Sequence, residues 1–374
     1  MKITNVEAIG LQVALKDFMV PNRNYLLTKI TTDEGIVGWG QIGTIGHPEL
    51  AMMLVNRLKP ILIGQDPFDM PKFWDKWFDN PLAVLSWGHK GAEAFVMSGV
   101  DIALWDIVGK ACNKPIHKLL GGARDKIRLY ASHGEPDKIE DYIANGFTAF
   151  KFGASHPSIF PGKVQGLQDL DDTLKKLRKT VGDEFDLIID AWQGYSLPAA
   201  MQVAKLCEKH NVVWFEEPIL SYDFDGMAAL ARSTTVPLAA GEHQYTSREA
   251  ADLILKSGIQ FVQCDVVTCG GISEAFKVAA IARSRGITYQ PHCTETPVNF
   301  AAMLQVLGAV SNAFLAEWQV GHSMGILPGT GAPLRWELIK EPFKIKNGWV
   351  EIPNKPGLGI EIDEKVVEKY RWKI

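Results

Sequence analysis

Val212-Val-Trp-Phe-Glu-Glu-Pro-Ile219 is an apolar run of β-branched and aromatic residues that ends abruptly in two carboxylates and a proline. From Val212 to Phe215 the run predicts a short, fully buried strand. The same pattern occurs upstream in Leu187-Ile-Ile-Asp190 and downstream in Leu238-Ala-Ala-Gly-Glu242. Intervals of 26 residues separate Asp190, Glu216 and Glu242, enough for one strand, one helix and two loops. Three buried strands are therefore expected to present a carboxylate at their C-terminal ends.

Strand and helix patterns alternate from Ile127 onward, which indicates parallel β-α-β units. The predicted strands end near Ser132, Phe152, Asp190, Phe215, Gly241, Cys264, Pro291 and Ala316. Helical patterns lie between them, near 137–145, 165–181, 197–210, 224–233, 247–257, 273–286 and 297–309. Eight strands joined by seven helices favour a closed (β/α)7β barrel of the TIM type over an open doubly wound sheet. No Gly-x-Gly-x-x-Gly follows the first strand, which argues against a dinucleotide-binding fold.

Residues 1–125 predict a separate α+β unit. Three strands that form a meander are expected at 3–13, 25–32 and 37–40. Helical patterns dominate from Glu49 to Lys118, and the segment Gly99 to Lys110 has small and apolar residues on nearly every face. We expect that helix to be buried between layers.

The length of 374 residues fits a barrel of about 250 residues plus a smaller domain. A strand and turn pattern from Trp349 to Ile362 is assigned back to the N-terminal unit. The predicted division is therefore an α+β capping domain of 1–125, completed by 340–374, and a barrel of 126–339.

The composition points to small-molecule partners. A net charge of −4 and a pI near 6.2 give no electrostatic footprint for nucleic acid or an anionic membrane. Five cysteines are an odd number without a Cys-x-x-Cys pair, which favours a reducing, cytoplasmic compartment over a disulfide framework. The first residues lack the apolar core of a signal peptide, and no run of about 18 apolar residues occurs.

Charged residues stand at the predicted C-terminal strand ends, where barrel active sites lie. They are Lys151, Asp190, Glu216, Glu242, Asp265 and His292, with Glu317 just past the eighth strand. A single acid there could be an ordinary solvated loop residue, but Asp190, Glu216 and Glu242 come from three adjacent strands. Carboxylates so close would repel each other unless a cation held them, and a set of oxygens alone suits Mg²⁺ better than Zn²⁺.

Asp265 and His292 come from neighbouring strands, and a carboxylate that orients an imidazole makes it a general base. A lone histidine in an apolar stretch such as Tyr289-Gln-Pro-His292 is more often structural than catalytic. The aspartate at the end of the adjacent strand reverses this expectation and favours a catalytic His292. Lys151 can place positive charge on a substrate carboxylate, or it can form a salt bridge with Glu217. A cation beside a base and a lysine suits removal of a proton next to a carboxylate.

At these residues the chain resembles the enolase superfamily, within its mandelate racemase group. The matching stretches are Gly99-Val-Asp-Ile-Ala-Leu-Trp-Asp106, the Asp190/Glu216/Glu242 triple, Trp214-Phe-Glu-Glu-Pro218 and Pro291-His292. The resemblance covers nearly the whole chain. It implies an N-terminal capping domain whose loops close over the barrel, one Mg²⁺, and proton abstraction alpha to a carboxylate. It also makes a dimer or an octamer plausible.

Within the group, the sequence is most similar to L-rhamnonate dehydratase and related acid-sugar dehydratases. The supporting stretches are Asp190-Ala-Trp192, Gly241-Glu-His243, Asp265-Val-Val-Thr-Cys-Gly-Gly-Ile272, Ile281-Ala-Arg-Ser-Arg-Gly286 and Lys355-Pro-Gly-Leu-Gly-Ile-Glu361. By this resemblance Asp190, Glu216 and Glu242 are the metal ligands and Asp265 with His292 is the base. Glu317 matches the acidic residue that hydrogen-bonds the substrate carboxylate.

One departure bears on mechanism. Racemases of the group carry Lys-x-Lys on the second strand, whereas this chain has Lys151-Phe-Gly153. A single base suits dehydration of an aldonate to a 2-keto-3-deoxy acid, with His292 serving both steps of a syn elimination. The loop Asp17 to Asn24 and the segment Pro291 to Thr296 differ from the L-rhamnonate pattern. Candidate substrate contacts are Asn22, Arg23, His47, His133, His156, Trp192, His243 and Trp318.

Three alternatives stay open. An epimerase or cycloisomerase keeps the fold, but the absent second lysine weighs against it. A catalytically idle relative could act as a metabolite sensor or structural subunit, although the complete set of ligands and the His/Asp pair argue against that. A phosphate site at Gly270-Gly271 is disfavoured because barrel phosphate sites prefer strands seven and eight.

Overall fold

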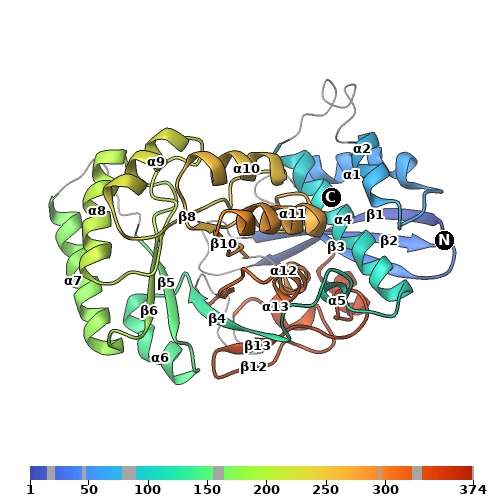
Figure 1. The fold of residues 1–374 in the computed structure, drawn as a ribbon. Coiled ribbons are helices and arrows are strands. Elements are labelled where there is room, and N and C mark those ends of the chain that lie inside the picture. Colours follow the sequence, from blue (N-terminus) through green and yellow to red (C-terminus); the bar gives the residue numbers. More distant parts are fainter. Residues whose placement is uncertain are drawn as a thin grey trace.

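The computed structural model describes residues 1–14, 22–43, 48–77, 90–154, 164–293, 296–321 and 331–372. Its N-terminal part contains an antiparallel sheet in the order β1-β2-β3, formed by β1 (Ile3–Ala14), β2 (Asn22–Thr32) and β3 (Val37–Ile42). The predicted meander is therefore confirmed. Figure 1 shows this sheet and its helices, coloured blue to cyan, at one end of the molecule.

Helices cover this sheet. The helices of this part are α1 (Pro48–Leu62), α2 (Met70–Trp77), α4 (Ala92–Ala111) and α5 (Ile116–Leu119). The prediction that α4 is buried is confirmed, since most of its residues are inaccessible to solvent. Gly40 of β3 lies so close to α4 that a Cβ there would collide with the carbonyl group of Gly99. Only glycine permits this approach of strand to helix.

The second and larger sheet is a parallel barrel. Its strands are β4 (Lys126–Ser132), β5 (Ala149–Gly153), β6 (Asp186–Asp190), β7 (Phe215–Glu216), β8 (Leu238–Ala240), β9 (Phe261–Val262), β10 (Thr288–Tyr289) and β11 (Ala316–Gln319). From β4 to β10 they pair in sequence order, and β11 pairs with β4. An isolated parallel bridge between Tyr289 and Ala313 joins β10 to the residues before β11 and closes the ring.

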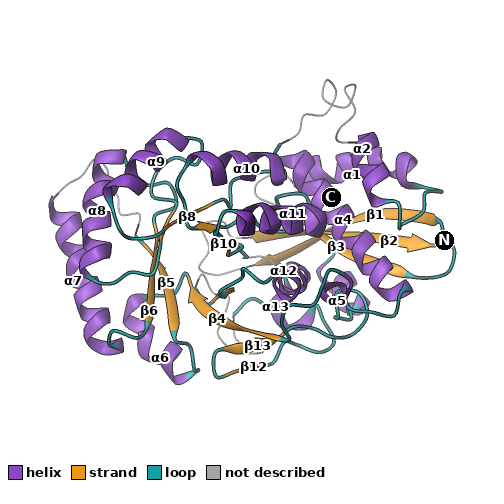
Figure 2. Cartoon of the chain, viewed as in Figure 1, coloured by secondary structure: helices purple, strands orange, loops and turns teal. Residues whose placement is uncertain are grey.

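Helices alternate with these strands along the chain. They are α6 (Ile139–Ala144), α7 (Val164–Val181), α8 (Leu197–Lys209), α9 (Phe224–Ser233), α10 (Thr246–Lys256), α11 (Gly271–Ser284) and α12 (Pro297–Ala309). Figure 2 shows α7, α8 and α9 outside the strands. The predicted fold, a (β/α)7β barrel with an N-terminal α+β capping domain, is confirmed.

Two strand boundaries correct the prediction. The strand expected from Val212 is reduced to Phe215–Glu216, although Val213 still donates a backbone hydrogen bond to Leu187 over 2.8 Å. The eighth strand begins at Ala316 and continues to Gln319, because its residues pair with β4. Glu317 therefore lies within this strand and not just past it.

The segment after the barrel contacts both parts of the chain. It holds α13 (Leu334–Glu337), β12 (Ile345–Lys346), β13 (Trp349–Glu351) and α14 (Glu364–Tyr370). β13, which contains Trp349, pairs antiparallel with barrel strand β4. Further on, Arg371 forms a bridge with Leu11, and the Trp372 amide donates to the Gly10 carbonyl over 2.8 Å. The predicted domain boundaries stay a prediction.

All five cysteines are free, and only Cys112 is exposed. None of the helices in the described part of the chain has the length and apolar character that a membrane crossing requires.

Candidate active site

The interior of the barrel explains why charged groups gather at one end. Large or apolar side chains fill its central layer, among them Tyr130, Ala149, Ile188, Trp214 and Leu315. Side chains two residues apart on a strand point to the same face. The next inward positions on these strands are Ser132, Lys151, Asp190, Glu216 and Glu317, all fully or almost fully buried. We call this end of the barrel the mouth.

Glu242 reaches the mouth by a different route. The interior layer contains Ala239, and two residues later stands Gly241 instead of a side chain. Gly241 has a φ of +134°, which other residues rarely adopt, and it turns the backbone before Glu242. One oxygen each of Asp190, Glu216 and Glu242 lies within 4.8 Å of the others. That separation is close to the span of about 4.2 Å across an octahedral Mg²⁺ ion.

These three carboxylates carry more negative charge than their surroundings neutralise. Burial, together with repulsion from neighbouring acids, raises the pKa of Glu216 and of Glu242 to about 7, and it also raises the pKa of Asp190. The single ammonium of Lys151 opposes this effect only in part. A divalent cation would relieve the repulsion, and a donor set made only of oxygens fits a hard ion.

Lys151 is fully buried among carboxylates. Its Nζ contacts Glu216 Oε1 and lies 3.3 Å from Asp190 Oδ2 and 3.2 Å from Glu317 Oε1. Burial alone would lower the pKa of this ammonium, but Glu216 and Glu317 overcome it and raise the pKa well above its ordinary value. Among the described residues these acids are its ion-pair partners, so the alternative salt bridge to Glu217 is not formed.

Both oxygens of Glu317 accept hydrogen bonds. Oε1 accepts from Ser132 Oγ and faces Lys151, and Oε2 accepts from the Cys293 amide over 2.8 Å. Burial would raise the pKa of Glu317, but Lys151, followed by His292, overcomes this effect and lowers it to about 2. Glu317 is therefore ionised at neutral pH and acts as an acceptor.

His292 and Asp265 meet as the sequence predicts. His292 Nδ1 lies 2.8 Å from Asp265 Oδ2, and the Val267 amide donates to the other oxygen, Oδ1, over 3.0 Å. The second ring nitrogen, Nε2, lies 3.8 Å from Glu242 Oε2. Burial would lower the pKa of His292, but Glu242 and Asp265 overcome it and raise the pKa well above its ordinary value. The imidazole is thus held by one carboxylate and faces the acidic cluster with its free nitrogen.

The family follows from two matches that together cover most of the chain. Residues 6–121 match the mandelate racemase / muconate lactonizing enzyme N-terminal domain, and residues 136–366 match the enolase C-terminal domain-like family. The chain belongs to the enolase superfamily. Within it the chain falls in the mandelate racemase group, which confirms the resemblance found in the sequence.

Several proteins are similar over nearly their whole length. An arabinonate dehydratase of Saccharolobus solfataricus is 31% identical over 372 residues, which cover 96% of this chain and 94% of that protein. A D-galactonate dehydratase of Verminephrobacter eiseniae is 32% identical over 364 residues, with 94% and 92% covered. The crystal structure of the 3,6-anhydro-D-galactonate cycloisomerase from Zobellia galactanivorans has a TM-score of 0.87 at 26% identity and is matched over 100% of both chains.

The candidate substrate contacts of this enolase-superfamily chain divide into groups. His133 lies at the mouth, with Nε2 3.6 Å from Asp190 Oδ2 and Nδ1 2.8 Å from Ser132 Oγ. Trp192, which follows the last residue of β6 by two positions, is 57% exposed. Trp318 is buried and packs on Phe300, and its contact with substrate stays a prediction.

Other candidates lie elsewhere. Arg23 is on β2 with its guanidinium carbon 5.3 Å from the centre of the Tyr25 ring. The side chain of Asn22 and all of His47 and His156 lie outside the described residues, as do Asp17 and Glu295 of the predicted substrate-reading segments. His243 pairs with Glu217 and is considered below.

Sequence reasoning missed several groups that hold the mouth together. Trp214 Nε1 donates to Glu216 Oε2 over 2.9 Å, and Ser132 donates to Glu317. The two-residue spacing of Trp214 and Glu216 could have revealed the first contact, since both point inward from one strand. The link from Ser132 to Glu317 joins residues 185 positions apart, and no local pattern predicts it.

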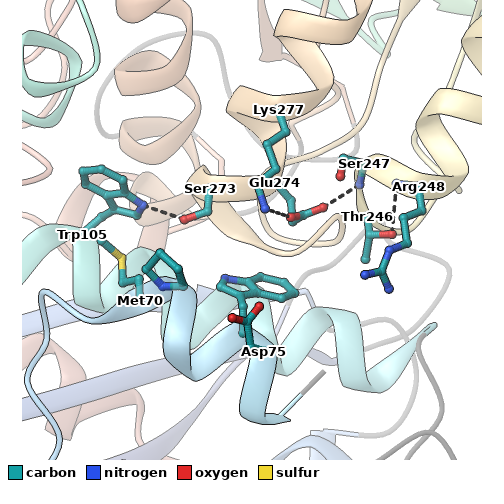
Figure 3. A pocket seen from close by; sticks show the side chains of 11 residues that line it. Met70, Asp75, Trp105, Thr246, Ser247, Arg248, Ser273, Glu274 and Lys277 are labelled. Carbon is teal, nitrogen blue, oxygen red and sulfur yellow. Dashed lines mark hydrogen bonds and ion pairs between the residues drawn. The ribbon is translucent and has the colours of Figure 1, made fainter. Parts of the chain in front are cut away.

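A cavity of about 470 Å³ lies apart from the mouth residues. Met70 and Trp105 of the capping helices line one side, and Ser273, Glu274 and Lys277 of α11 line the other (Figure 3). Trp105 Nε1 donates to Ser273 Oγ over 2.9 Å across it. None of the mouth residues lines this cavity, so it belongs to the seam between capping domain and barrel.

Proposed function

We propose that this protein is a Mg²⁺-dependent acid-sugar dehydratase. It removes the C2 proton of an aldonate, eliminates the 3-hydroxyl group as water and forms a 2-keto-3-deoxy acid. The observation that carries the proposal is the Asp265–His292 pair beside three clustered carboxylates. Two similar proteins of the superfamily are named as dehydratases of sugar acids, which supports the same reaction class.

His292 is the proposed base. Nδ1 donates to Asp265, so in the neutral ring Nε2 holds the lone pair that accepts the C2 proton. A divalent ion held by Asp190, Glu216 and Glu242 would offset the charge of Glu242, which raises the pKa of His292, and would so favour this neutral form. The resulting imidazolium gives this proton to the 3-hydroxyl group, which leaves as water, and the enol product converts to the ketone. One imidazole acting in both steps works from one face of the substrate, so the elimination is syn. Gly153, where racemases of the group carry a second lysine, provides no base for the other face.

The metal and lysine support the same chemistry. Asp190, Glu216 and Glu242 are the proposed ligands of Mg²⁺. A divalent ion bound there offsets the negative charge that develops on the substrate carboxylate when C2 loses its proton. Lys151 directs its ammonium toward the same carboxylate. Glu317, ionised and paired with Lys151, fixes the position of that ammonium. The predicted hydrogen bond between Glu317 and the substrate carboxylate would require a proton on one of the two groups, and it stays a prediction.

For the substrate, we propose a five- or six-carbon aldonate. Arabinonate and D-galactonate are the acids named for two similar proteins, and L-rhamnonate is the acid suggested by the sequence motifs. His133 and Trp192 are proposed contacts of the sugar chain, because His133 Nε2 lies 3.6 Å from Asp190 Oδ2 and Trp192 is exposed two residues after Asp190. Assembly as a homodimer or octamer and a cytoplasmic location stay predictions.

The test is a screen of pentonic, hexonic, 6-deoxyhexonic and aldaric acids with Mg²⁺, in which semicarbazide detects the 2-keto-3-deoxy product. His292→Asn serves as the inactive control, and chelation of the metal should abolish turnover. Product from a few related acids, lost in the control, supports the proposal. Exchange of deuterium into C2 without a keto product would instead indicate an epimerase or cycloisomerase. If every acid stays inert and no exchange occurs, the dehydratase proposal is wrong.

A further inference from the structure

A second carboxylate–imidazole pair lies beside the mouth, and the proposed reaction does not use it. His243 Nδ1 lies 2.8 Å from Glu217 Oε2, the same separation as in the Asp265–His292 pair. Glu217 directly follows Glu216, and His243 directly follows Glu242. Each member of the second pair is therefore a chain neighbour of one proposed metal ligand.

Glu242 lies between the two imidazoles. Its Oε2 is 3.8 Å from His292 Nε2, and its Oε1 is 3.6 Å from His243 Nδ1. The carboxylate thus has one ring on each side. His243 therefore contacts the Glu242 oxygen that does not face His292.

Glu217 has two features that cost stability. Its φ of +36° is in the left-handed region, although it is not glycine. Its carboxylate is fully buried, and Oε1 accepts no hydrogen bond within the described part of the chain. Among the described residues, His243 is therefore the ion-pair partner that offsets the charge of Glu217, through Oε2 alone.

The second pair is fixed by the loops that carry the metal ligands. The Gln193 amide, after β6, donates to the Glu217 carbonyl over 2.7 Å. The Glu217 amide in turn donates to Ala239 of β8 over 2.9 Å. The side-chain oxygen of Gln193 accepts from the Ser221 amide over 2.8 Å. The loops after β6, β7 and β8 are therefore joined around the Glu217–His243 pair.

We propose that Glu217 and His243 are positioning residues for Glu242, and that they raise the affinity of the three-carboxylate cluster for a divalent cation. His243 restricts the Glu242 carboxylate, and the unpaired oxygen of Glu217 adds negative potential to the site. Groups outside the ligand set commonly act in this way on metal affinity. The inference rests on the proposed function, because it requires an ion at Asp190, Glu216 and Glu242.

The inference is tested by measuring the affinity of the full chain for Mn²⁺ with electron paramagnetic resonance. His243→Asn and Glu217→Gln are the test variants. His210→Asn is the matched control, because His210 also pairs with a carboxylate, Asp171, over 2.6 Å but on the outer helices. We expect one Mn²⁺ per chain in the wild type and a Kd increased about 10- to 100-fold in both test variants. The control should bind as the wild type does.

Measurements of kcat and of the unfolding midpoint distinguish a positioning role of His243 and Glu217 from a catalytic or purely structural one. With a substrate found in the screen, kcat at saturating Mn²⁺ should fall less than the affinity falls. The unfolding midpoint of the metal-free His243→Asn protein should stay near that of the wild type, since this side chain is partly exposed. Glu217→Gln provides an independent variant with the same expected loss of affinity.

Four results would overturn the inference. Unchanged Mn²⁺ affinity in both variants would remove the positioning role. A second Mn²⁺ in the wild type that is lost in His243→Asn would mean that Glu217, Glu242 and His243 form an ion site of their own. A collapse of kcat with intact affinity would place His243 on the substrate. If the wild type binds no Mn²⁺ at all, the metal proposal itself fails, and this inference fails with it.

Discussion

Replacing Asp265 with asparagine should inactivate the base while leaving its position almost unchanged. The Val267 amide donates to Oδ1 of Asp265 over 3.0 Å, so the amide oxygen of the variant must occupy that place. The NH2 group then stands where Oδ2 faces His292 Nδ1 at 2.8 Å. Asn299 Nδ2 donates to Asp265 Oδ2 over 3.4 Å, so in the variant the Asn299 amide must turn to present Oδ1, which has no partner among the described residues, to this NH2.

The consequence is a change of tautomer in His292. An NH2 group donates to Nδ1, and the neutral imidazole then carries its proton on Nε2, where no lone pair is left to accept the C2 proton. In the serine protease triad the same substitution lowers kcat about 10⁴-fold. We therefore expect Asp265→Asn to lower kcat by about 10³- to 10⁴-fold, equivalent to about 4–5.5 kcal/mol of transition-state stabilisation.

The assay is steady-state turnover of the acid that the wild type dehydrates, together with exchange of deuterium at C2. Both rates should fall together, since proton removal precedes elimination. Asp101→Asn is the matched control, because Asp101 is also a buried aspartate but interacts with Ser273 and Trp74 outside the mouth. Mn²⁺ affinity and the unfolding midpoint should be unchanged in Asp265→Asn. A loss of less than tenfold in kcat would refute the tautomer argument.

Further predictions concern the buried charges. Lys151→Met leaves three carboxylates without their cation. Urea unfolding of the metal-free protein at pH 8 should therefore show that the free energy of unfolding falls by about 3–5 kcal/mol. A fall of less than about 1 kcal/mol would mean that the three carboxylates do not need Lys151 to remain buried. Glu317→Gln places an NH2 group opposite hydrogen-bond donors and should lower the free energy of unfolding by about 1–3 kcal/mol. The variant that carries both substitutions should lose less than the sum of the two losses, because Lys151 and Glu317 interact. Burial raises the pKa of Asp101 from 3.8 to about 6. Its native pKa lies above the unfolded value, so its stabilising contribution is complete below pH 3.8 and is lost as the pH rises through 6. Relative to wild type, Asp101→Asn should therefore gain about 2.4 kcal/mol of unfolding free energy between pH 4 and pH 7, and a difference that stays constant with pH would contradict the assignment.

The sequence allowed the barrel and most of the mouth to be predicted because both follow from short-range rules. The repeated apolar run that ends in an acid predicted Asp190 and Glu216 at the mouth. Each lies two residues after an inward-facing residue, Ile188 or Trp214, and residues two apart on a strand point to the same face. The pairing of Asp265 with His292 followed from adjacent strands. Glu242 was also identified, although its route through the positive φ of Gly241 is visible only in the structure.

What could not be predicted depends on contacts between distant segments. The partners of Lys151 were left open, because its long side chain can reach several strand ends and only the structure selects Glu216, Asp190 and Glu317. The strand at Trp349 has an apolar pattern that fits either sheet, and pairing with β4 buries Val350 beside Ile127. Glu317 was placed outside its strand because four residues of β11 offer too short a pattern to define an end.

The contact between β1 and residues 371–372 has a consequence for how the chain acquires its structure. Strand β1 leaves the ribosome before the barrel strands and carries Gly10 and Leu11, and their backbone partners are Trp372 and Arg371, made about 360 residues later. Lys29 of β2 likewise pairs with Glu364 of α14 over 2.7 Å. Synthesis at about 5–20 residues per second would leave that strand edge unpaired for tens of seconds while the barrel forms. The capping sheet is thus made before the barrel, and its contacts are completed only after the barrel strands have been made.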